Sequence, residues 1–295
     1  MGNGKMAQEP DSNRYLNHSV QDLLSLKGRT VVITGGARGL GLAFALAVAE
    51  SGGNVAVLDI ADAPHEHFYK FQKELQVKLE FYKVDVTQYD ALKATFEQLA
   101  KDFGRIDGLI TAAGICLDQP FLERDPISVA RCMNINVLGT YYAAQLAAAQ
   151  MDRQEPTDFN PRGGSIVMIA SMAAGVASKG QRISDYCASK GAVVSLARAL
   201  GVELAAKGIR VNSISPGYMV TDMALGLCSR SPWLREIMNT EPPMRRMGDR
   251  TDLKVPVVYL LSNASAYHTG DDLLITGGVH AGRLMSMETA TDAKG

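Results

Sequence analysis

Short apolar runs rich in β-branched residues alternate along the chain with longer stretches of helical periodicity. Glycine or polar residues bound each short run, which is typical of strands buried on both faces of a parallel sheet. The predicted strands are 30–34, 54–58, 79–84, 108–111, 165–169, 210–214 and 273–276. The predicted helices cover about 42–51, 89–103, 127–151, 185–206 and 251–261. This alternation predicts an α/β fold: a doubly wound parallel sheet of about seven strands with helices on both faces.

The pattern fills one domain, predicted for residues 25–283, because α/β folds of this size form a single unit. Residues 1–24 lack periodicity and predict a flexible extension, and 284–295 predict a polar tail. The segment 152–164 is polar and contains two prolines, so we expect a surface loop there.

Charge and cysteine usage narrow the class of protein. The chain has 295 residues, with 30 Lys and Arg against 31 Asp and Glu, so it has no basic excess for nucleic acid or an acidic membrane. No apolar run is long enough to span a bilayer, and the start lacks a secretory h-region. The cysteines have neither disulfide-framework nor metal-site spacing, so we expect reduced thiols and no bound metal. A cytoplasmic location is the expectation.

A glycine cluster between the first strand and the first helix is the first candidate for chemistry. Gly35, Gly39 and Gly41 follow Thr34, with Leu40 between the last two. A strand, a glycine-rich turn and a helix N-terminus aim backbone N–H groups at a phosphate, and a β-carbon would block its approach. The cluster therefore predicts a Rossmann-type dinucleotide site.

Asp59 and Arg38 bear on which dinucleotide binds. Asp59, at the end of the second strand, could accept hydrogen bonds from the adenosine ribose and would repel a 2′-phosphate. Arg38, inside the glycine loop, could meet that phosphate instead, or could be a solvated turn residue. Asp59 would contact the ribose directly, so it favours NAD as the cofactor. Because of Arg38, NADP stays an alternative.

Two further strand ends carry candidate ligand contacts. Asp85 and Val86 follow the third strand and could frame the adenine, although Asp85 could equally cap the next helix. Small residues after the fourth strand, Ala113 and Gly114, would allow close approach of a ligand or simply form a tight turn.

Tyr186 and Lys190 are four residues apart on a predicted helix, so their side chains share a face. A neighbouring ammonium favours the phenolate and should lower the pKa of Tyr186 towards the working range of an acid/base group. Ser171 follows the fifth strand, where open α/β sheets place ligands. Asn134 and Asn136 lie in the middle of the predicted helix 127–151, where asparagine is a mediocre residue, so at least one of them is expected to have a hydrogen-bonding task.

The segment 218–247 is rich in methionine and aromatic residues. An apolar lid over a substrate pocket would have this composition, and so would an ordinary packed helix pair.

Together these motifs resemble the short-chain dehydrogenase/reductases in order and spacing, from about residue 26 to residue 278. The segments 169–172 and 210–218, with fifteen residues from Ser171 to Tyr186, resemble the fungal branch that interconverts polyols and ketoses.

The resemblance implies a role for each matching residue. Tyr186 would be the general acid/base, Lys190 would lower its pKa and bind the nicotinamide ribose, and Ser171 would bond the substrate oxygen. Asn136 would hold a water that links Lys190 to solvent. The implied nucleotide contacts are Thr34, Gly35, Gly39, Leu40, Gly41, Asp59, Asp85, Val86, Pro216, Gly217, Val220 and Thr221. Members of the family are usually homodimers or homotetramers.

Two positions depart from the family pattern. Ala112 stands where an asparagine is usual after the fourth strand, and Thr276 stands where an aspartate is usual near the end. The first departure puts a backbone-organising hydrogen bond in doubt, and the second bears on subunit assembly.

Three functions follow as hypotheses. The leading one is NAD(P)-dependent hydride transfer between the cofactor and a secondary alcohol or ketone, plausibly a polyol and its ketose. The second is a ketoreductase of secondary metabolism or of 3-oxoacyl type, which acts on a larger apolar ketone. The third is a non-catalytic dinucleotide sensor, which an intact tyrosine and lysine disfavour.

Overall fold

A seven-stranded sheet organises the computed structural model, which describes residues 13–158, 160–178 and 180–282. The strands are β1 (Thr30–Thr34), β2 (Asn54–Asp59), β3 (Leu79–Lys83), β4 (Gly108–Thr111), β5 (Gly164–Ile169), β6 (Ile209–Pro216) and β7 (Asp272–Ile275). All neighbours pair in parallel, in the order β3-β2-β1-β4-β5-β6-β7. This order confirms the predicted Rossmann-type doubly wound sheet.

The register brings the carboxyl ends of the central strands level with one another. Thr34 at the end of β1 pairs with Leu58 of β2 on one side and with Thr111 of β4 on the other. Strand order reverses between β1 and β4, which is the position where such sheets bind ligands. Every residue of β1, β4, β5 and β6 is buried, including the polar residues Arg210, Asn212, Ser213 and Ser215 of β6.

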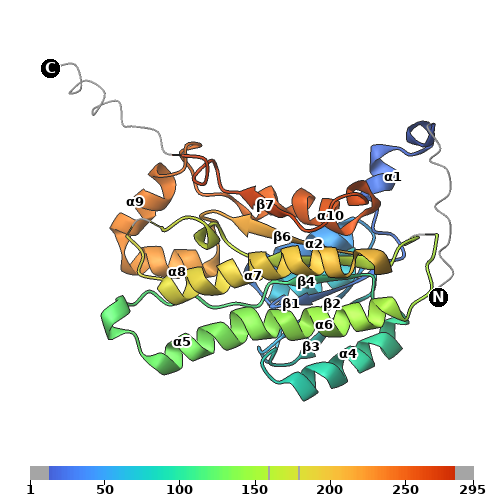
Figure 1. Cartoon of the computed structure of the whole chain (residues 1–295), viewed down its shortest axis with the longest axis horizontal. Helices are drawn as coiled ribbons and strands as arrows, with labels where there is room; N and C mark the ends of the chain where they lie inside the picture. The colour runs from blue at the N-terminus through green and yellow to red at the C-terminus, as the bar shows by residue number, and fades with distance from the viewer. Residues whose placement is uncertain (1–12, 159, 179, 283–295) are drawn as a thin grey trace.

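Helices cover both faces of the sheet (Figure 1). They are α1 (Val20–Leu24), α2 (Gly39–Glu50), α3 (Glu66–Glu74), α4 (Tyr89–Phe103), α5 (Pro126–Met133), α6 (Gly139–Asp152), α7 (Ser184–Glu203), α8 (Asp222–Arg230), α9 (Pro232–Thr240) and α10 (Lys254–Leu261). Short helical turns are η1 (Arg14–Asn17), η2 (Phe121–Glu123), η3 (Asn134–Leu138), η4 (Met172–Ala174), η5 (Ala205–Lys207), η6 (Arg250–Leu253) and η7 (Asn263–Ser265).

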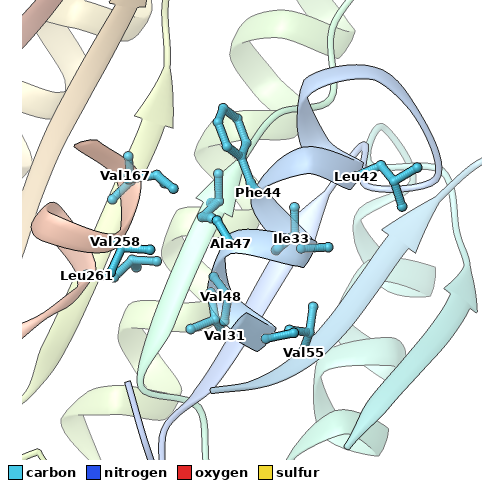
Figure 2. Close-up of a cluster of buried hydrophobic side chains, with 14 of the residues drawn as sticks. Val31, Ile33, Leu42, Phe44, Ala47, Val48, Val55, Val167, Val258 and Leu261 are labelled. Atoms are coloured by element: carbon cyan, nitrogen blue, oxygen red, sulfur yellow. The ribbon is translucent and has the colours of Figure 1, made fainter. Parts of the chain in front are cut away.

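Two hydrophobic clusters hold these layers together. On one face, Phe44 and Val48 of α2 pack with Val31 of β1 and with Val258 and Leu261 of α10 (Figure 2). On the other face, α4, α6 and α7 bury leucine, phenylalanine and a stripe of small alanines against the strands. Burial of this area on both faces fixes the sheet on which the strand-end residues stand.

Several boundaries differ from the sequence prediction. Helix α2 begins at Gly39, three residues before its predicted start, so it begins within the glycine cluster. The predicted helix 127–151 is interrupted by a π-helical turn, η3, which contains Asn136. Helix α3 was not predicted; only Phe68 of it is buried, and the side chain of His65 caps it.

The predicted extension 1–24 contains η1 and α1 in its described part. Residues 1–12, and the predicted tail 284–295, lie outside the described residues. The mobility of both ends and the domain boundaries stay predictions.

Candidate active site

A cavity of about 890 Å³ opens along the carboxyl ends of the strands. Asp59 of β2, Ile169 of β5 and Pro216 of β6 line it from the sheet. The glycine turn before α2 forms one end, and the loops around α7, α8 and α9 form the other. Strand ends therefore place residues from distant parts of the sequence around one space.

Tyr186 and Lys190 lie on the first turns of α7 and both face this cavity. The Lys190 ammonium lies 5.6 Å from the centre of the Tyr186 ring and donates to the Ile169 carbonyl at 2.7 Å. The lysine is buried, with 6% of its surface exposed. The shared face predicted from the spacing is confirmed, and the carbonyl at the end of β5 fixes the ammonium beside the ring.

Ser171 extends the pair to a second hydroxyl group. It lies directly after β5 and lines the same cavity as Tyr186, close enough for its side chain to lower the pKa of the tyrosine. Its oxygen also accepts from the Ala173 N–H at 3.1 Å, which caps η4 and fixes the serine. Ser171 and Tyr186 thus present two hydroxyl groups to one cavity, an arrangement suited to holding a single substrate oxygen.

Burial controls the acid/base properties of the pair. Burial raises the pKa of Tyr186 well above its usual value, with a smaller contribution from Cys116, and the nearby Ser171 side chain opposes the rise. Burial also lowers the pKa of Lys190 to about 8. The expectation that Lys190 brings the tyrosine pKa down is therefore not met here, because removal of the phenolate from water outweighs the other influences.

Asn136 is fully buried in η3 and lies behind the cavity, outside its lining. Its amide donates to the Ile115 carbonyl at 3.0 Å and accepts from the Ile115 N–H at 2.9 Å. It also donates to the Ser189 hydroxyl at 3.0 Å. π-helical turns often occur at functional sites, and this one allows Asn136 to tie the loop after β4 to α7. The predicted hydrogen-bonding task is confirmed; its link to a water stays a prediction.

The glycine turn fits a dinucleotide phosphate. A Cβ on Gly41 would lie 2.1 Å from the Gly35 carbonyl oxygen, so the turn closes only with glycine. Gly35 and Gly39 have φ values of +69° and +61°, and a Cβ on Gly39 would meet open space. Among the described side chains none caps the first turn of α2, so its N–H groups can bind an anion.

Asp59 and Arg38 both line the cavity at the nucleotide end. Asp59 accepts from the N–H groups of Ala37 at 3.0 Å and Ala61 at 3.1 Å, which hold its carboxylate in place. Arg38 is exposed. Both residues therefore lie at the same end of the cavity as the glycine turn, and their contact with the adenosine ribose stays a prediction.

The structure brings most of the predicted nucleotide contacts to this cavity. Its lining includes Gly35, Arg38, Gly39, Leu40, Gly41, Asp59, Asp85, Val86, Ala113, Gly114, Pro216, Gly217 and Thr221. Thr34 and Val220 do not belong to the lining: Thr34 is buried in β1, and the Val220 N–H bonds the Gly248 carbonyl. Asp85 bonds Thr87 through its side chain and does not cap α4, which leaves the adenine role as a prediction.

Sequence reasoning missed the residues at the substrate end. Cys116, Leu117 and Asp118 follow β4, while Gln181 and Ile183 precede α7. They lie in loops without periodicity, where only their position just after a strand or just before Tyr186 could have indicated a role. Ile60, directly after Asp59, also lines the cavity and could have been found by the strand-end rule.

The methionine-rich segment 218–247 forms two short helices that both pack together and face the cavity. Tyr218, Cys228, Leu234 and Met238 form a small hydrophobic cluster, and Leu227 packs against it. Leu227 and Met238 also line the cavity. The two alternatives posed by composition therefore coexist, and the movement of this segment as a lid stays a prediction.

The two departures from the family pattern have local partners. The Ala112 N–H bonds the Thr34 carbonyl at 3.0 Å, which ties the loop after β4 to β1. The Thr276 hydroxyl lies 2.6 Å from Nδ1 of His280.

Several other features bear on function. All four cysteines are unpaired. Across residues 13–158, 160–178 and 180–282, no group of three or more His, Cys, Asp or Glu is gathered to hold a metal. No helix within those same ranges is both long and apolar enough to cross a membrane.

Comparison with known proteins agrees with this geometry. A family model described as enoyl-(acyl carrier protein) reductase matches residues 35–280. The NADP-dependent mannitol dehydrogenase of Hypocrea jecorina is 34% identical over 91% of this chain and 97% of its own length. The sorbose reductase of Schizosaccharomyces pombe is 35% identical over 87% of this chain and 97% of its own length.

A solved structure extends the likeness to three dimensions. The NADPH-dependent 3-quinuclidinone reductase of Rhodotorula rubra superposes with a TM-score of 0.82 at 33% identity, and the match covers 94% of this chain and 99% of that one. The parallel sheet, the glycine turn and the Ser171, Tyr186 and Lys190 arrangement occur together in one chain. The protein therefore belongs to the short-chain dehydrogenase/reductase family and is an NAD(P)-dependent oxidoreductase.

Proposed function

We propose that this enzyme transfers a hydride between NAD(H) and a secondary alcohol or ketone, with a polyol and its ketose as the substrate pair. The observation that carries the proposal is that Ser171, Tyr186 and the buried Lys190 ammonium line the same cavity of about 890 Å³ as the glycine turn. These groups can hold a carbonyl or alcohol oxygen and move one proton to or from it.

Each polar group has a distinct task in this proposal. The nicotinamide, when bound, accepts or supplies the hydride. Ser171 holds the substrate oxygen, and Tyr186 donates a proton to it in reduction or accepts one in oxidation. Because burial keeps the tyrosine protonated, neutral pH favours its action as a donor, and therefore ketone reduction. The Lys190 ammonium stabilises negative charge that develops on the tyrosine oxygen.

The chain's own residues are suited to hold the nucleotide. The N–H groups at the start of α2 would bind the pyrophosphate, with Gly41 allowing the turn to close. Asp85 and Val86 would lie at the adenine, and Pro216, Gly217 and Thr221 at the nicotinamide. Lys190 would reach the nicotinamide ribose.

Asp59 supports NAD as the preferred nucleotide. Two backbone N–H groups fix its carboxylate at the cavity, where it would accept from ribose hydroxyls and oppose a 2′-phosphate. The mannitol dehydrogenase and the quinuclidinone reductase are named for NADP and NADPH, which weighs for NADP. We give more weight to the Asp59 carboxylate, because it belongs to this chain and not to a relative, and we therefore propose NAD. A measured preference for NADPH would overturn this choice.

The polyol proposal is supported by the names of two relatives and by the polar groups of the cavity. Asp118 and Gln181 supply hydrogen-bonding side chains at the substrate end. A larger apolar ketone is the second candidate, since Leu227 and Met238 give the cavity an apolar wall. One relative is named for the reduction of 3-quinuclidinone, a ketone that is not a sugar.

A matched substrate panel tests the two candidates. Xylitol, arabinitol and mannitol would be assayed with NAD⁺, and their ketoses with NADH, beside aromatic and β-keto ketones. The polyol proposal predicts the highest kcat/KM within the sugar series. Turnover of apolar ketones with none of any polyol or ketose would establish the second candidate.

Assembly and location are also proposals. A homodimer or homotetramer follows from the family resemblance, and the partly exposed Leu138 and Tyr141 on the η3 and α6 surface are consistent with it. The unpaired cysteines support a cytoplasmic location.

A further inference from the structure

A buried ion pair lies beside the catalytic tyrosine, and the proton-transfer scheme gives it no task. Arg124 Nη1 is 2.5 Å from Asp185 Oδ1, and the two side chains are 3% and 0% exposed. Arg124 follows η2, while Asp185 is the second residue of α7 and directly precedes Tyr186. The pair thus joins two segments that are about sixty residues apart in the sequence.

The second terminal nitrogen of Arg124, Nη2, contacts three backbone carbonyls of loops that line the cavity. Arg124 Nη2 lies 3.1 Å from the Leu117 carbonyl, 2.9 Å from the Gln119 carbonyl and 2.5 Å from the Arg182 carbonyl. All three carbonyl residues line the cavity. One side chain therefore fixes the loop after β4 and the loop before α7 together, which the Gln119 N–H to Arg182 carbonyl bond of 3.0 Å reinforces.

The Asp185 carboxylate contacts both Arg124 and the backbone of Tyr186. Asp185 Oδ1 accepts the backbone N–H of Tyr186 at 2.7 Å and pairs with Arg124 through the same oxygen. Position and orientation of the first turn of α7 are thereby linked to the substrate loops. Because both side chains are almost fully covered, they contact this backbone rather than a ligand.

The geometry of the pair is not that of a simple stabilising bridge. Among the described residues, Arg124 Nε, Arg124 Nη1 and Asp185 Oδ2 are buried without a hydrogen-bond partner, so the contact between Nη1 and Asp185 Oδ1 is an ion pair without hydrogen-bond geometry. Burying two charges with unmet hydrogen-bonding capacity costs free energy that an apolar pair would avoid. The planar Arg124 guanidinium contacts one carboxylate and three backbone carbonyls at once. It therefore fixes the relative positions of the segments that carry them.

We propose that Arg124 and Asp185 are positioning residues, which set the distance between the Tyr186 hydroxyl and a substrate held by the loop after β4. The proposal rests on the hydride-transfer function above. If the contacts of Arg124 with Asp185 and the three carbonyls are lost, the substrate should be misplaced relative to Tyr186. The nucleotide end of the cavity should be unchanged.

The test compares Arg124→Lys and Asp185→Asn with the wild-type enzyme. Arg124→Lys keeps the positive charge opposite Asp185 but cannot reach the carboxylate and the carbonyls together. Rates are expressed per nucleotide-binding site, measured by titration, so that unfolded protein does not count. Lys207→Met, in an exposed pair with Asp152 on another face, is the matched control.

We expect Arg124→Lys to lower kcat/KM for the substrate by about tenfold to a hundredfold. Nucleotide Kd should stay within about twofold, and the isotope effect with 4-deuterated NADH should rise because the chemical step becomes slower relative to binding. The same changes are expected of Asp185→Asn; if that variant does not fold, Arg124→Lys alone decides.

Wild-type kcat/KM and isotope effect in folded Arg124→Lys would overturn the proposal. A loss of nucleotide affinity as large as the loss of substrate kcat/KM would overturn it too, since that would show a general structural role. Failure of the proposed function is a separate result: the wild-type enzyme itself would turn over no alcohol or ketone with either nucleotide.

Discussion

The Lys190 ammonium lies 5.6 Å from the centre of the Tyr186 ring, held there by the carbonyl of Ile169. Both side chains stand on one face of α7, and burial acts on them in opposite senses. It raises the pKa of the tyrosine and lowers the pKa of the lysine, because in each case it disfavours the charged form. The pair is therefore a protonated phenol beside an ammonium whose charge is lost at moderately alkaline pH.

This relationship predicts an alkaline limit to ketone reduction. The pKa of Lys190 is lowered to about 8, so its ammonium is present below that pH and is lost as the pH rises through it. We expect kcat/KM for reduction to fall above about pH 8, measured over pH 6 to 10 with saturating nucleotide. The residual kcat/KM of Lys190→Met should not show this fall above pH 8. A wild-type profile that stays flat to pH 10 would contradict the assignment.

The glycine turn predicts a selective defect in nucleotide binding. In Gly41→Ala, the new Cβ would lie 2.1 Å from the Gly35 carbonyl oxygen, so the turn must open. We expect nucleotide Kd to rise by about tenfold or more, measured by fluorescence titration. Gly226→Ala, in α8 where a Cβ meets nothing within 4 Å, is the control and should bind nucleotide normally. Equal affinity in Gly41→Ala and wild type would show that this turn does not bind the phosphates.

Asp59 predicts the choice of nucleotide. The wild-type enzyme should have a higher kcat/KM with NADH than with NADPH. Replacing the carboxylate in Asp59→Ser removes a like charge from the site of the 2′-phosphate, and should shift the ratio towards NADPH by about tenfold or more. Asp62→Ser, at an exposed aspartate paired with Lys83, should leave the ratio unchanged. An unaltered ratio in Asp59→Ser would place the ribose elsewhere.

Much of the fold could be predicted because its signals are local. The run 30–34 is β-branched and bounded by glycines, so it reads as a buried strand, and β1 occupies those residues. The four-residue spacing of Tyr186 and Lys190 is also local, since helical geometry alone puts them on one face. Helix α3 shows the limit. Phe68, Phe71 and Leu75 have helical spacing, but the helix is short and mostly polar, and His65 is not among the favoured capping residues, so the signal was missed.

The remaining parts of the site depend on contacts between segments far apart in the sequence. The sequence predicted one continuous helix over 127–151, and the two asparagines indicated only a hydrogen-bonding task. The π-helical turn accompanies the bonds of Asn136 to Ile115 and Ser189, which are distant in the sequence. Nothing local relates Arg124 to Asp185. The tyrosine pKa was expected to be low because of the neighbouring lysine charge alone. Desolvation acts in the opposite direction, and its size depends on how deeply the folded chain buries the hydroxyl.

Proton transfer by the Tyr186 hydroxyl predicts a large, selective defect in Tyr186→Phe. The variant keeps the ring beside Lys190 and removes only the hydroxyl. Tyr142→Phe, on α6 where the ring stacks on Tyr89, is a matched control. Single-turnover hydride transfer and nucleotide Kd should be measured on the same folded samples.

We predict that Tyr186→Phe binds nucleotide with wild-type affinity and transfers hydride about a hundredfold or more slowly, while Tyr142→Phe transfers it normally. Hydride transfer at the wild-type rate in folded Tyr186→Phe would contradict the account.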